Sequence, residues 1–187
     1  VVVLVPGAAA AIGAARAAGY AVVGVSNQSG IGRGRFGEDD LARVMRRLDE
    51  LLAAEGTAFD AFYYCPHAPE EGCRCRKPGP GLLEEAATRF EWDADRSWMV
   101  GDKAGDVTFG RRAGLGSVLV RTGYGAGEEA AVSAGVRKSG LLLASQPGSS
   151  VLRCCPGRCG RDQVDGKIPK ALALPIACVR LWTPSLP

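Results

Sequence analysis

Helical and strand signals alternate along the first 125 residues of this chain, and this alternation constrains its fold more than any other sequence feature. The segment PGAAAAIGAARAAG (6–19) begins with proline and ends with glycine, the usual punctuation of a helix. The segment that follows, YAVVGVSN (20–27), is a short apolar run typical of a buried strand. Strands separated by helices of this length predict an α/β fold, with a parallel sheet and helices on both faces.

The same alternation continues beyond the first helix and strand. In the segment 38–56, EDDLARVMRRLDELLAAEG, apolar residues recur with the i, i+3, i+4, i+7 spacing of an amphipathic helix. The other expected elements are a strand at 58–64, a helix at 79–90, a strand at 97–102, a helix at 104–114 and a strand at 116–123. Because ligands bind at the carboxyl ends of the strands in such sheets, polar residues that end three of them predict one active-site edge. These residues are Ser26 with Asn27, Cys65 with its loop, and Asp102.

The pattern stops after about Gly127, where prolines and glycines are scattered and no period is found. We therefore expect one domain over residues 1–127 and a poorly ordered extension over 128–187. Four cysteines lie in this extension without a histidine, so a second metal site is the less favoured alternative. They are Cys154, Cys155, Cys159 and Cys178.

Charge and hydropathy exclude some partners. The net charge is +3, and the basic excess lies in the extension, where no aromatic residues alternate with the charges, so we expect no nucleic-acid partner. No run of about 18 apolar residues offers a membrane span, and the opening VVVLV is too short for a signal peptide. We expect a monomeric protein in the cytoplasm. In that compartment clustered cysteines indicate a metal site more than disulfides.

The loop YYCPHAPEEGCRCRKPGPG (63–81) holds three of the seven cysteines and the single histidine of the chain. Cys65 and His67, followed by Cys73 and Cys75, supply the four ligands of a closed tetrahedral zinc site. Because protein atoms fill all four positions, no place is left for water or substrate, and the zinc is expected to be structural. The alternative is a set of free cytosolic thiols beside an ordinary histidine.

Three further signals are weak when taken singly. Ser26 ends a strand and could bind a phosphate together with the amides that follow it, or could simply cap a turn. Lys77 could act as a point charge on a phosphoryl group, or could be a solvated lysine. Asp102 and Asp106 offer the carboxylate oxygens that Mg²⁺ prefers, although either could instead cap a helix.

Together and in this order, Ser26, Lys77 and Asp102-x-x-x-Asp106 resemble the second, third and fourth motifs of the haloacid dehalogenase (HAD) phosphatase superfamily. The segments SNQSGIGRG, CRCRKPGPG and MVGDKAGDV are similar to those of the D-glycero-D-manno-heptose 1,7-bisphosphate 7-phosphatase family, whose close relatives include histidinol-phosphate phosphatases. The resemblance runs from about Pro6 to Gly125. It implies a HAD-like Rossmannoid sheet with a small zinc-binding loop.

The resemblance also implies an activity, the Mg²⁺-dependent removal of the C7 phosphate during the synthesis of nucleotide-activated heptose for lipopolysaccharide. Ser26 and Lys77 would stabilise the transferring phosphoryl group, and Arg76 would recognise the substrate. A phosphoryl transition state needs such clamping of its spread negative charge by cations and oriented donors. The substrate-binding residues implied in this way are Ser26, Asn27, Gln28, Ser29, Arg76 and Lys77.

Two cofactors follow from the same resemblance. Structural Zn²⁺ would occupy the cysteine loop, and catalytic Mg²⁺ would be held by Asp102 and the backbone at Lys103. Asp106 is a candidate supporting residue of the magnesium site. The expected partner is a small sugar phosphate.

One departure from the family pattern concerns the first strand. The family's nucleophile and general acid/base are two aspartates in an Asp-x-Asp motif, which should lie a few tens of residues before Leu4 and is absent from this sequence. Asp39 and Asp40 cannot replace it, because they begin an amphipathic helix and lack the spacing. The chain could be an N-terminally truncated sequence or a degenerate, non-catalytic relative, and the retained motif residues favour truncation. Besides the heptose phosphatase, a histidinol-phosphate phosphatase and a non-catalytic, zinc-stabilised sugar-phosphate binder are therefore open alternatives.

Overall fold

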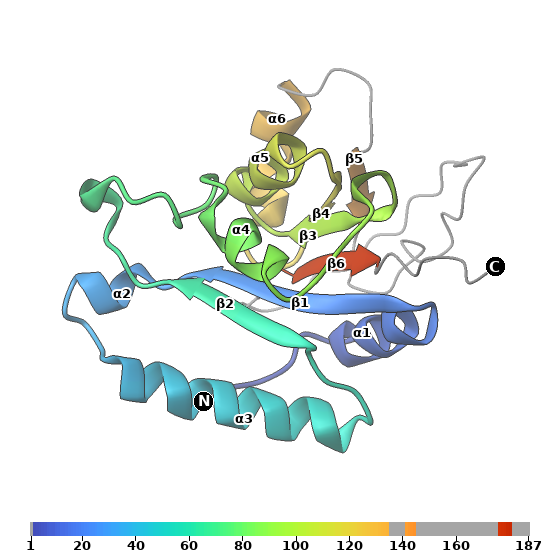
Figure 1. The fold of residues 1–187 in the computed structure, drawn as a ribbon, viewed down its shortest axis with the longest axis horizontal. Helices are drawn as coiled ribbons and strands as arrows, with labels where there is room; N and C mark the ends of the chain where they lie inside the picture. The colour runs from blue at the N-terminus through green and yellow to red at the C-terminus, as the bar shows by residue number, and fades with distance from the viewer. Residues whose placement is uncertain (1, 135–140, 145–175, 181–187) are drawn as a thin grey trace.

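The fold is an α/β sandwich built on one mostly parallel sheet (Figure 1). The computed structural model describes residues 2–134, 141–144 and 176–180. The strands are β1 (Tyr20–Asn27), β2 (Ala61–Cys65), β3 (Trp98–Gly101), β4 (Gly116–Val120), β5 (Leu141–Ala144) and β6 (Ile176–Arg180). The helices are α1 (Ala8–Ala17), α2 (Ser29–Gly32), α3 (Glu38–Ala54), α4 (Gly81–Ala87), α5 (Ala104–Arg112) and α6 (Gly125–Ala134), with 3₁₀ turns at Pro69–Glu71 and Ala94–Arg96.

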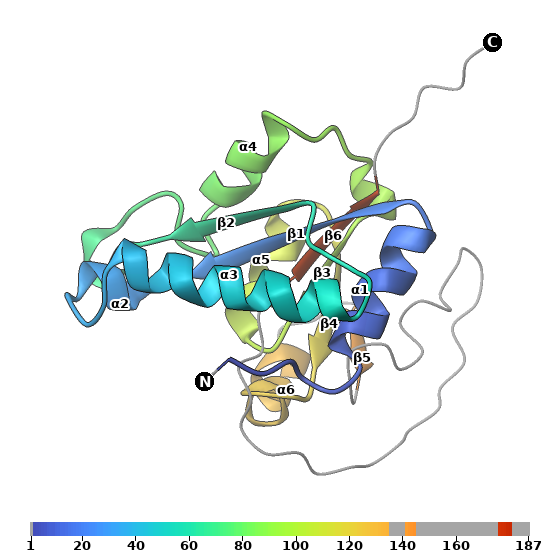
Figure 2. The same cartoon turned by 90° about the horizontal axis from the view of Figure 1, so that it is seen from below.

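Helices cover both faces of the sheet, as the sequence predicts. Helices α1 and α3 lie on one face, and α4 and α5 lie on the other (Figures 1 and 2). Successive side chains of β1 point to opposite faces, so this one strand contributes to both apolar cores. Val22 packs with apolar residues of α1 and α3, namely Ile12, Ala15, Leu48 and Leu52. Val23 and Val25 pack in the second core, which includes Leu82, Leu83 and Phe109.

The sheet has the order β2-β1-β6-β3-β4-β5. Strand β1 pairs in parallel with β2, and β4 pairs in parallel with both β3 and β5. The parallel α/β fold predicted from the sequence is therefore confirmed for these strands. In the β1–β2 ladder Asn27 lies opposite Cys65, so the two strands end at the same level.

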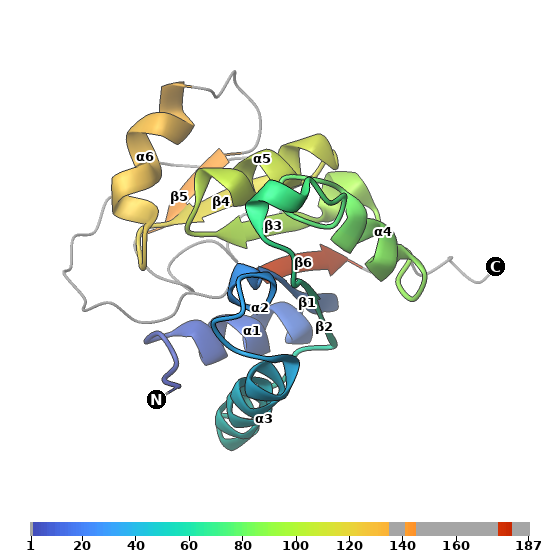
Figure 3. The same cartoon turned by 90° about the vertical axis from the view of Figure 1, so that its left-hand side faces the viewer.

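Strand β6 departs from the predicted sheet. It lies between β1 and β3 and runs antiparallel to both, with Cys178 opposite Val22 on one side and Trp98 on the other (Figure 3). The centre of the sheet, where the resemblance implies a first strand, is thus occupied by a segment from the far end of the chain.

Within residues 128–187, where the sequence predicts a poorly ordered extension, the structure describes part of α6 together with β5 and β6. A boundary at residue 127 lies inside α6, although the division into a domain and an extension stays a prediction. Strands of four and five residues show no period of their own, and the neighbouring strands determine where they form. Three cysteines of the second metal hypothesis, Cys154, Cys155 and Cys159, lie outside the described residues.

No helix within the described ranges has both the length and the apolar composition needed to cross a membrane. Predicted and observed elements otherwise differ mainly at their ends. The helix expected at 79–90, for example, is the shorter α4, which begins after Pro80.

Candidate active site

The carboxyl ends of β1 and β3 bring the predicted site residues to one edge of the sheet. Ser26 and Asn27 complete β1, and Asp102 directly follows β3. The cysteine loop leaves the end of β2 and returns to the end of β1 at Lys77, which exchanges two hydrogen bonds with Asn27. The fold therefore brings the predicted residues together at one edge of the sheet.

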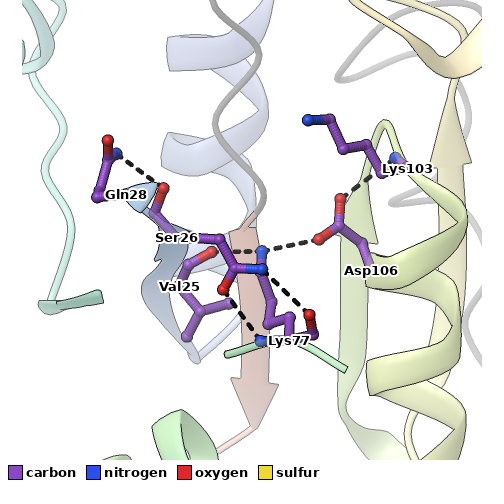
Figure 4. Close-up of polar contacts among 7 residues, drawn as sticks. Val25, Ser26, Gln28, Lys77, Lys103 and Asp106 are labelled. Carbon is purple, nitrogen blue, oxygen red and sulfur yellow. Dashed lines mark hydrogen bonds and ion pairs between the residues drawn. The ribbon is translucent and has the colours of Figure 1, made fainter. Parts of the chain in front are cut away.

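Lys77 lies at the centre of this edge with only 7% of its surface exposed. Its ammonium donates to the carbonyl oxygen of Val25 at 2.7 Å and forms an ion pair with Asp106 Oδ1, also at 2.7 Å (Figure 4). Burial lowers the pKa of Lys77, and the neighbouring charge of Asp106 opposes that shift. Lys77 is thus a buried cation with a fixed position, which rules out the solvated lysine considered from the sequence.

The two predicted carboxylates of this edge have different partners. Asp102 is 3% exposed, and its Oδ2 accepts a hydrogen bond from the Tyr124 amide at 3.0 Å. Burial raises the pKa of Asp102, although the hydrogen bond from Tyr124 counters part of this effect. Asp106 accepts from the Lys103 amide at 3.2 Å through Oδ2 while its Oδ1 pairs with Lys77. Asp106 therefore both closes the first turn of α5 and holds Lys77.

The segment that ends β1 continues this network. Ser26 is 5% exposed, and its hydroxyl accepts a hydrogen bond from Gln28 Nε2 at 2.9 Å (Figure 4). The backbone N–H of Gln28 donates to the Cys65 carbonyl at 2.7 Å. Ser29 begins the short helix α2. A buried hydroxyl followed by a helix start has the arrangement of a phosphate-binding turn.

The cysteine loop gathers its four candidate ligands. One ligand atom from each of Cys65, His67, Cys73 and Cys75 lies within 4.8 Å of all the others. His67 Nδ1 is 3.2 Å from Cys75 Sγ and 3.6 Å from Cys65 Sγ, and the Cys65 and Cys73 sulfurs are 3.5 Å apart. A tetrahedral zinc ion with Zn–S bonds of about 2.3 Å needs ligand atoms roughly 3.8 Å apart. These residues fit a closed four-coordinate zinc site.

The protonation state of the cysteine thiols affects metal binding to the cysteine loop. Burial, helped by a hydrogen bond with Cys75, raises the pKa of the Cys65 thiol to about 12. A metal ion stabilises the thiolate and would reverse this shift, so binding would release protons.

Hydrogen bonds and an ion pair connect the cysteine loop to α2 and α4. The Gly32 amide at the end of α2 donates to the Pro66 carbonyl at 2.8 Å, and the Arg74 guanidinium forms a two-point ion pair with Glu84 of α4. Arg76, the expected substrate-recognition residue, reaches back to the His67 carbonyl at 3.5 Å through Nη1. The loop thus connects the ligand cluster to the segment that carries Arg76 and Lys77.

Sequence reasoning missed Tyr124, which contributes to this edge in two ways. The Tyr124 amide fixes Asp102, but a backbone donor carries no residue-type signal. The ring of Tyr124 lies 4.3 Å from Lys103 Nζ and is part of a residue that is 66% exposed. An aromatic residue beside polar loop residues was the only sequence signal for Tyr124.

The chain is similar in sequence to phosphatases of one kind. A family model described as HAD-hydrolase-like matches residues 74–139. The chain is 39% identical over 139 residues to the D-glycero-beta-D-manno-heptose-1,7-bisphosphate 7-phosphatase of Pseudomonas putida, which covers 74% of this chain and 78% of that relative. It is 42% identical over 115 residues to the D-glycero-alpha-D-manno-heptose-1,7-bisphosphate 7-phosphatase of Burkholderia mallei, which covers 58% of this chain and 61% of that relative.

A similar fold is found in a crystal structure of D,D-heptose 1,7-bisphosphate phosphatase from B. bronchiseptica in complex with magnesium and phosphate. The TM-score is 0.72 at 33% sequence identity, and the match covers 81% of this chain and 82% of that one. The agreement therefore extends over most of both chains.

Proposed function

The chain belongs to the D-glycero-D-manno-heptose 1,7-bisphosphate 7-phosphatase family of the HAD-like hydrolases, and from this membership we propose that it removes the C7 phosphate of the heptose bisphosphate. The observation that carries the proposal is the fixed position of Lys77, held by Val25 and Asp106, at the carboxyl edge of the sheet to which Ser26 and Asp102 also belong. A buried ammonium with two fixed partners can stabilise a phosphoryl group without reorganising during the reaction.

Each residue of the edge has a separate part in the proposal. Lys77 stabilises the charge on the phosphoryl oxygens, and the Ser26 hydroxyl with the amides that follow it orients them. Asp102 and the backbone at Lys103 would hold Mg²⁺, which supplies charge neutralisation on the phosphate. Asp106 supports this site indirectly, because both of its oxygens are engaged by Lys77 and the start of α5.

We assign the cysteine loop a structural zinc. The four ligands close the coordination sphere, so the ion would contribute folding energy rather than chemistry. The zinc would hold the loop so that Arg76 faces the substrate and Lys77 reaches the end of β1. Clustered thiolates of this kind suit a reducing compartment, and we place the protein in the cytoplasm as a monomer.

Turnover also needs a nucleophile. The strand position between β1 and β3 is taken by β6, whose five residues, IACVR, contain no carboxylate. The test therefore measures phosphate release from heptose 1,7-bisphosphate with Mg²⁺ in two proteins. One is this chain, and the other is this chain extended at its N-terminus by a strand that carries Asp-x-Asp.

The proposal predicts phosphate release from the extended chain and its loss in the extended chain with Lys77→Met. Absence of release from the extended chain would overturn it. Both anomers are assayed, because relatives of this chain have names that specify one or the other. Histidinol phosphate serves as a third substrate, and preferential release from it would assign the sister activity instead.

A non-catalytic role is the second candidate, and the position of β6 at the centre of the sheet favours it. A zinc-stabilised sugar-phosphate binder would bind the bisphosphate in calorimetry and release no phosphate in either protein. If only the extended chain releases phosphate, the non-catalytic role applies only to the chain without Asp-x-Asp.

A further inference from the structure

Asn27 exchanges a pair of hydrogen bonds with the backbone of Lys77, fifty positions away in sequence. The Lys77 amide donates to Asn27 Oδ1 at 3.0 Å, and Asn27 Nδ2 donates to the Lys77 carbonyl at 3.1 Å. A primary amide carries one acceptor and donor hydrogens side by side, so it can pair with both polar groups of one residue, as a neighbouring strand would. Lys77 lies in a loop, and none of the strands in the described part of the chain pairs with it.

The other end of Lys77 is fixed to the same strand. Its ammonium donates to the carbonyl of Val25, two positions before Asn27 on β1. The Val25 carbonyl and the Asn27 side chain both belong to the end of β1, so Lys77 is attached to this strand through its ammonium and through its main chain. Asp106 on α5 supplies the third contact and orients the ammonium.

We propose that Asn27 is a positioning residue, which holds the main chain of Lys77 to the end of β1 so that the ammonium lies at the phosphate site. The family resemblance implies that Asn27 is one of the substrate-binding residues. The geometry gives it another task, because its Oδ1 and one of its Nδ2 hydrogens are engaged by Lys77. The effect on phosphate binding rests on the proposed function, whereas the effect on Lys77 does not.

The primary amide is the feature that this role requires. Alanine removes both hydrogen bonds, while aspartate keeps the acceptor for the Lys77 amide and loses the donor to the Lys77 carbonyl. Gln28 is the matched control, because its amide also lies in this segment but donates to Ser26 instead of Lys77. Three variants therefore distinguish loss of the hydrogen bonds to Lys77 from a general disturbance of the segment. They are Asn27→Ala, Asn27→Asp and Gln28→Ala.

The first readout is the ammonium cross-peak of Lys77 in a ¹H–¹⁵N spectrum of the full chain, assigned by its loss in Lys77→Met. An ammonium held by two buried acceptors exchanges slowly with water and gives a distinct signal. We expect Asn27→Ala and Asn27→Asp to shift the cross-peak or broaden it beyond detection, and Gln28→Ala to leave it in place. A purely structural role of Asn27 would lower the free energy of unfolding but leave this signal unchanged below the unfolding transition.

The second readout is the affinity for inorganic phosphate in the presence of Mg²⁺. Asn27→Ala should weaken binding about tenfold through displacement of Lys77, which corresponds to about 1.4 kcal/mol. An unchanged Lys77 cross-peak in a folded Asn27→Ala or Asn27→Asp protein would overturn the proposal. If the unsubstituted chain binds no phosphate, the assignment of Ser26, Lys77 and Asp102 to a phosphate site in this chain fails, and the cross-peak alone still decides the role of Asn27.

Discussion

Lys77 and Asp106 form an ion pair of 2.7 Å in which the two side chains are only 3% and 5% exposed. The pair joins the end of the cysteine loop to the first turn of α5, so it connects two segments that each carry site residues. A buried charge that loses its partner is strongly unfavourable, because neither water nor a counter-charge then compensates it.

Asp106→Asn should therefore lower the free energy of unfolding by about 3 kcal/mol or more. The measurement is urea unfolding of the full chain at neutral pH. Glu70→Gln is the control, since its pair with Arg33 has exposed side chains and pairs of that kind contribute only about 0–1 kcal/mol. If Asp106→Asn and Glu70→Gln lower the free energy of unfolding by the same small amount, the Lys77–Asp106 pair does not stabilise the fold as a buried ion pair.

Gly101→Ala should displace the Asp106 carboxylate. A Cβ at Gly101 would lie 2.5 Å from the Asp106 Cβ and 2.6 Å from its Cγ, closer than packed atoms tolerate. We expect a loss of stability of about 1–3 kcal/mol, as for other overpacked sites, together with weaker phosphate binding. Gly105→Ala is the matched control, because a Cβ there meets nothing within 4 Å and alanine favours the helix. Similar unfolding curves for the two variants would count against this tight contact.

Purified protein should contain about one zinc ion per chain by metal analysis. Cys73→Ser should lose the metal and destabilise the loop, since the remaining three ligands cannot close the tetrahedral site. Cys178→Ser removes a cysteine outside this group and should leave the zinc content unchanged. A well-folded, zinc-free parent protein would contradict the structural role assigned to the metal.

Cys178→Pro should strongly destabilise the fold if β6 holds the two halves of the sheet together. Residue 178 pairs with Val22 of β1 and with Trp98 of β3, so a proline there removes a backbone donor from the centre of the sheet. The expected loss is about 3 kcal/mol or more in urea unfolding. Cys178→Ala keeps the backbone N–H and is the comparison. If both variants unfold at the same urea concentration, β6 is not a central strand.

The sequence was most informative where elements are bounded by local signals. The strand predicted at 20–27 is β1, because an apolar run between a glycine and a polar turn defines both of its ends. The ligand group was predictable for a similar reason, since all four residues lie within eleven positions of one loop. Strand β6 could not be predicted, because five residues show no period and their partners β1 and β3 lie far away in sequence.

Contacts within the site were harder to predict than its location. Ser26 and Asp102 follow from strand ends and Lys77 follows from the loop after Cys65. The Asn27–Lys77 pair, however, joins positions fifty apart through a backbone that has no residue-type signal. Likewise, nothing in the sequence distinguishes Asp106 as a partner of Lys77 from Asp106 as a simple helix cap. The structure gives it both tasks.

The proposed function requires that the edge formed by Ser26, Lys77 and Asp102 binds a phosphoryl group together with Mg²⁺. Calorimetric titration of the full chain with inorganic phosphate, with and without Mg²⁺, tests this most directly. We expect one phosphate per chain, binding that depends on Mg²⁺, and at least a tenfold loss of phosphate affinity in Lys77→Met. No saturable binding, or equal affinity in the parent chain and Lys77→Met, would contradict it.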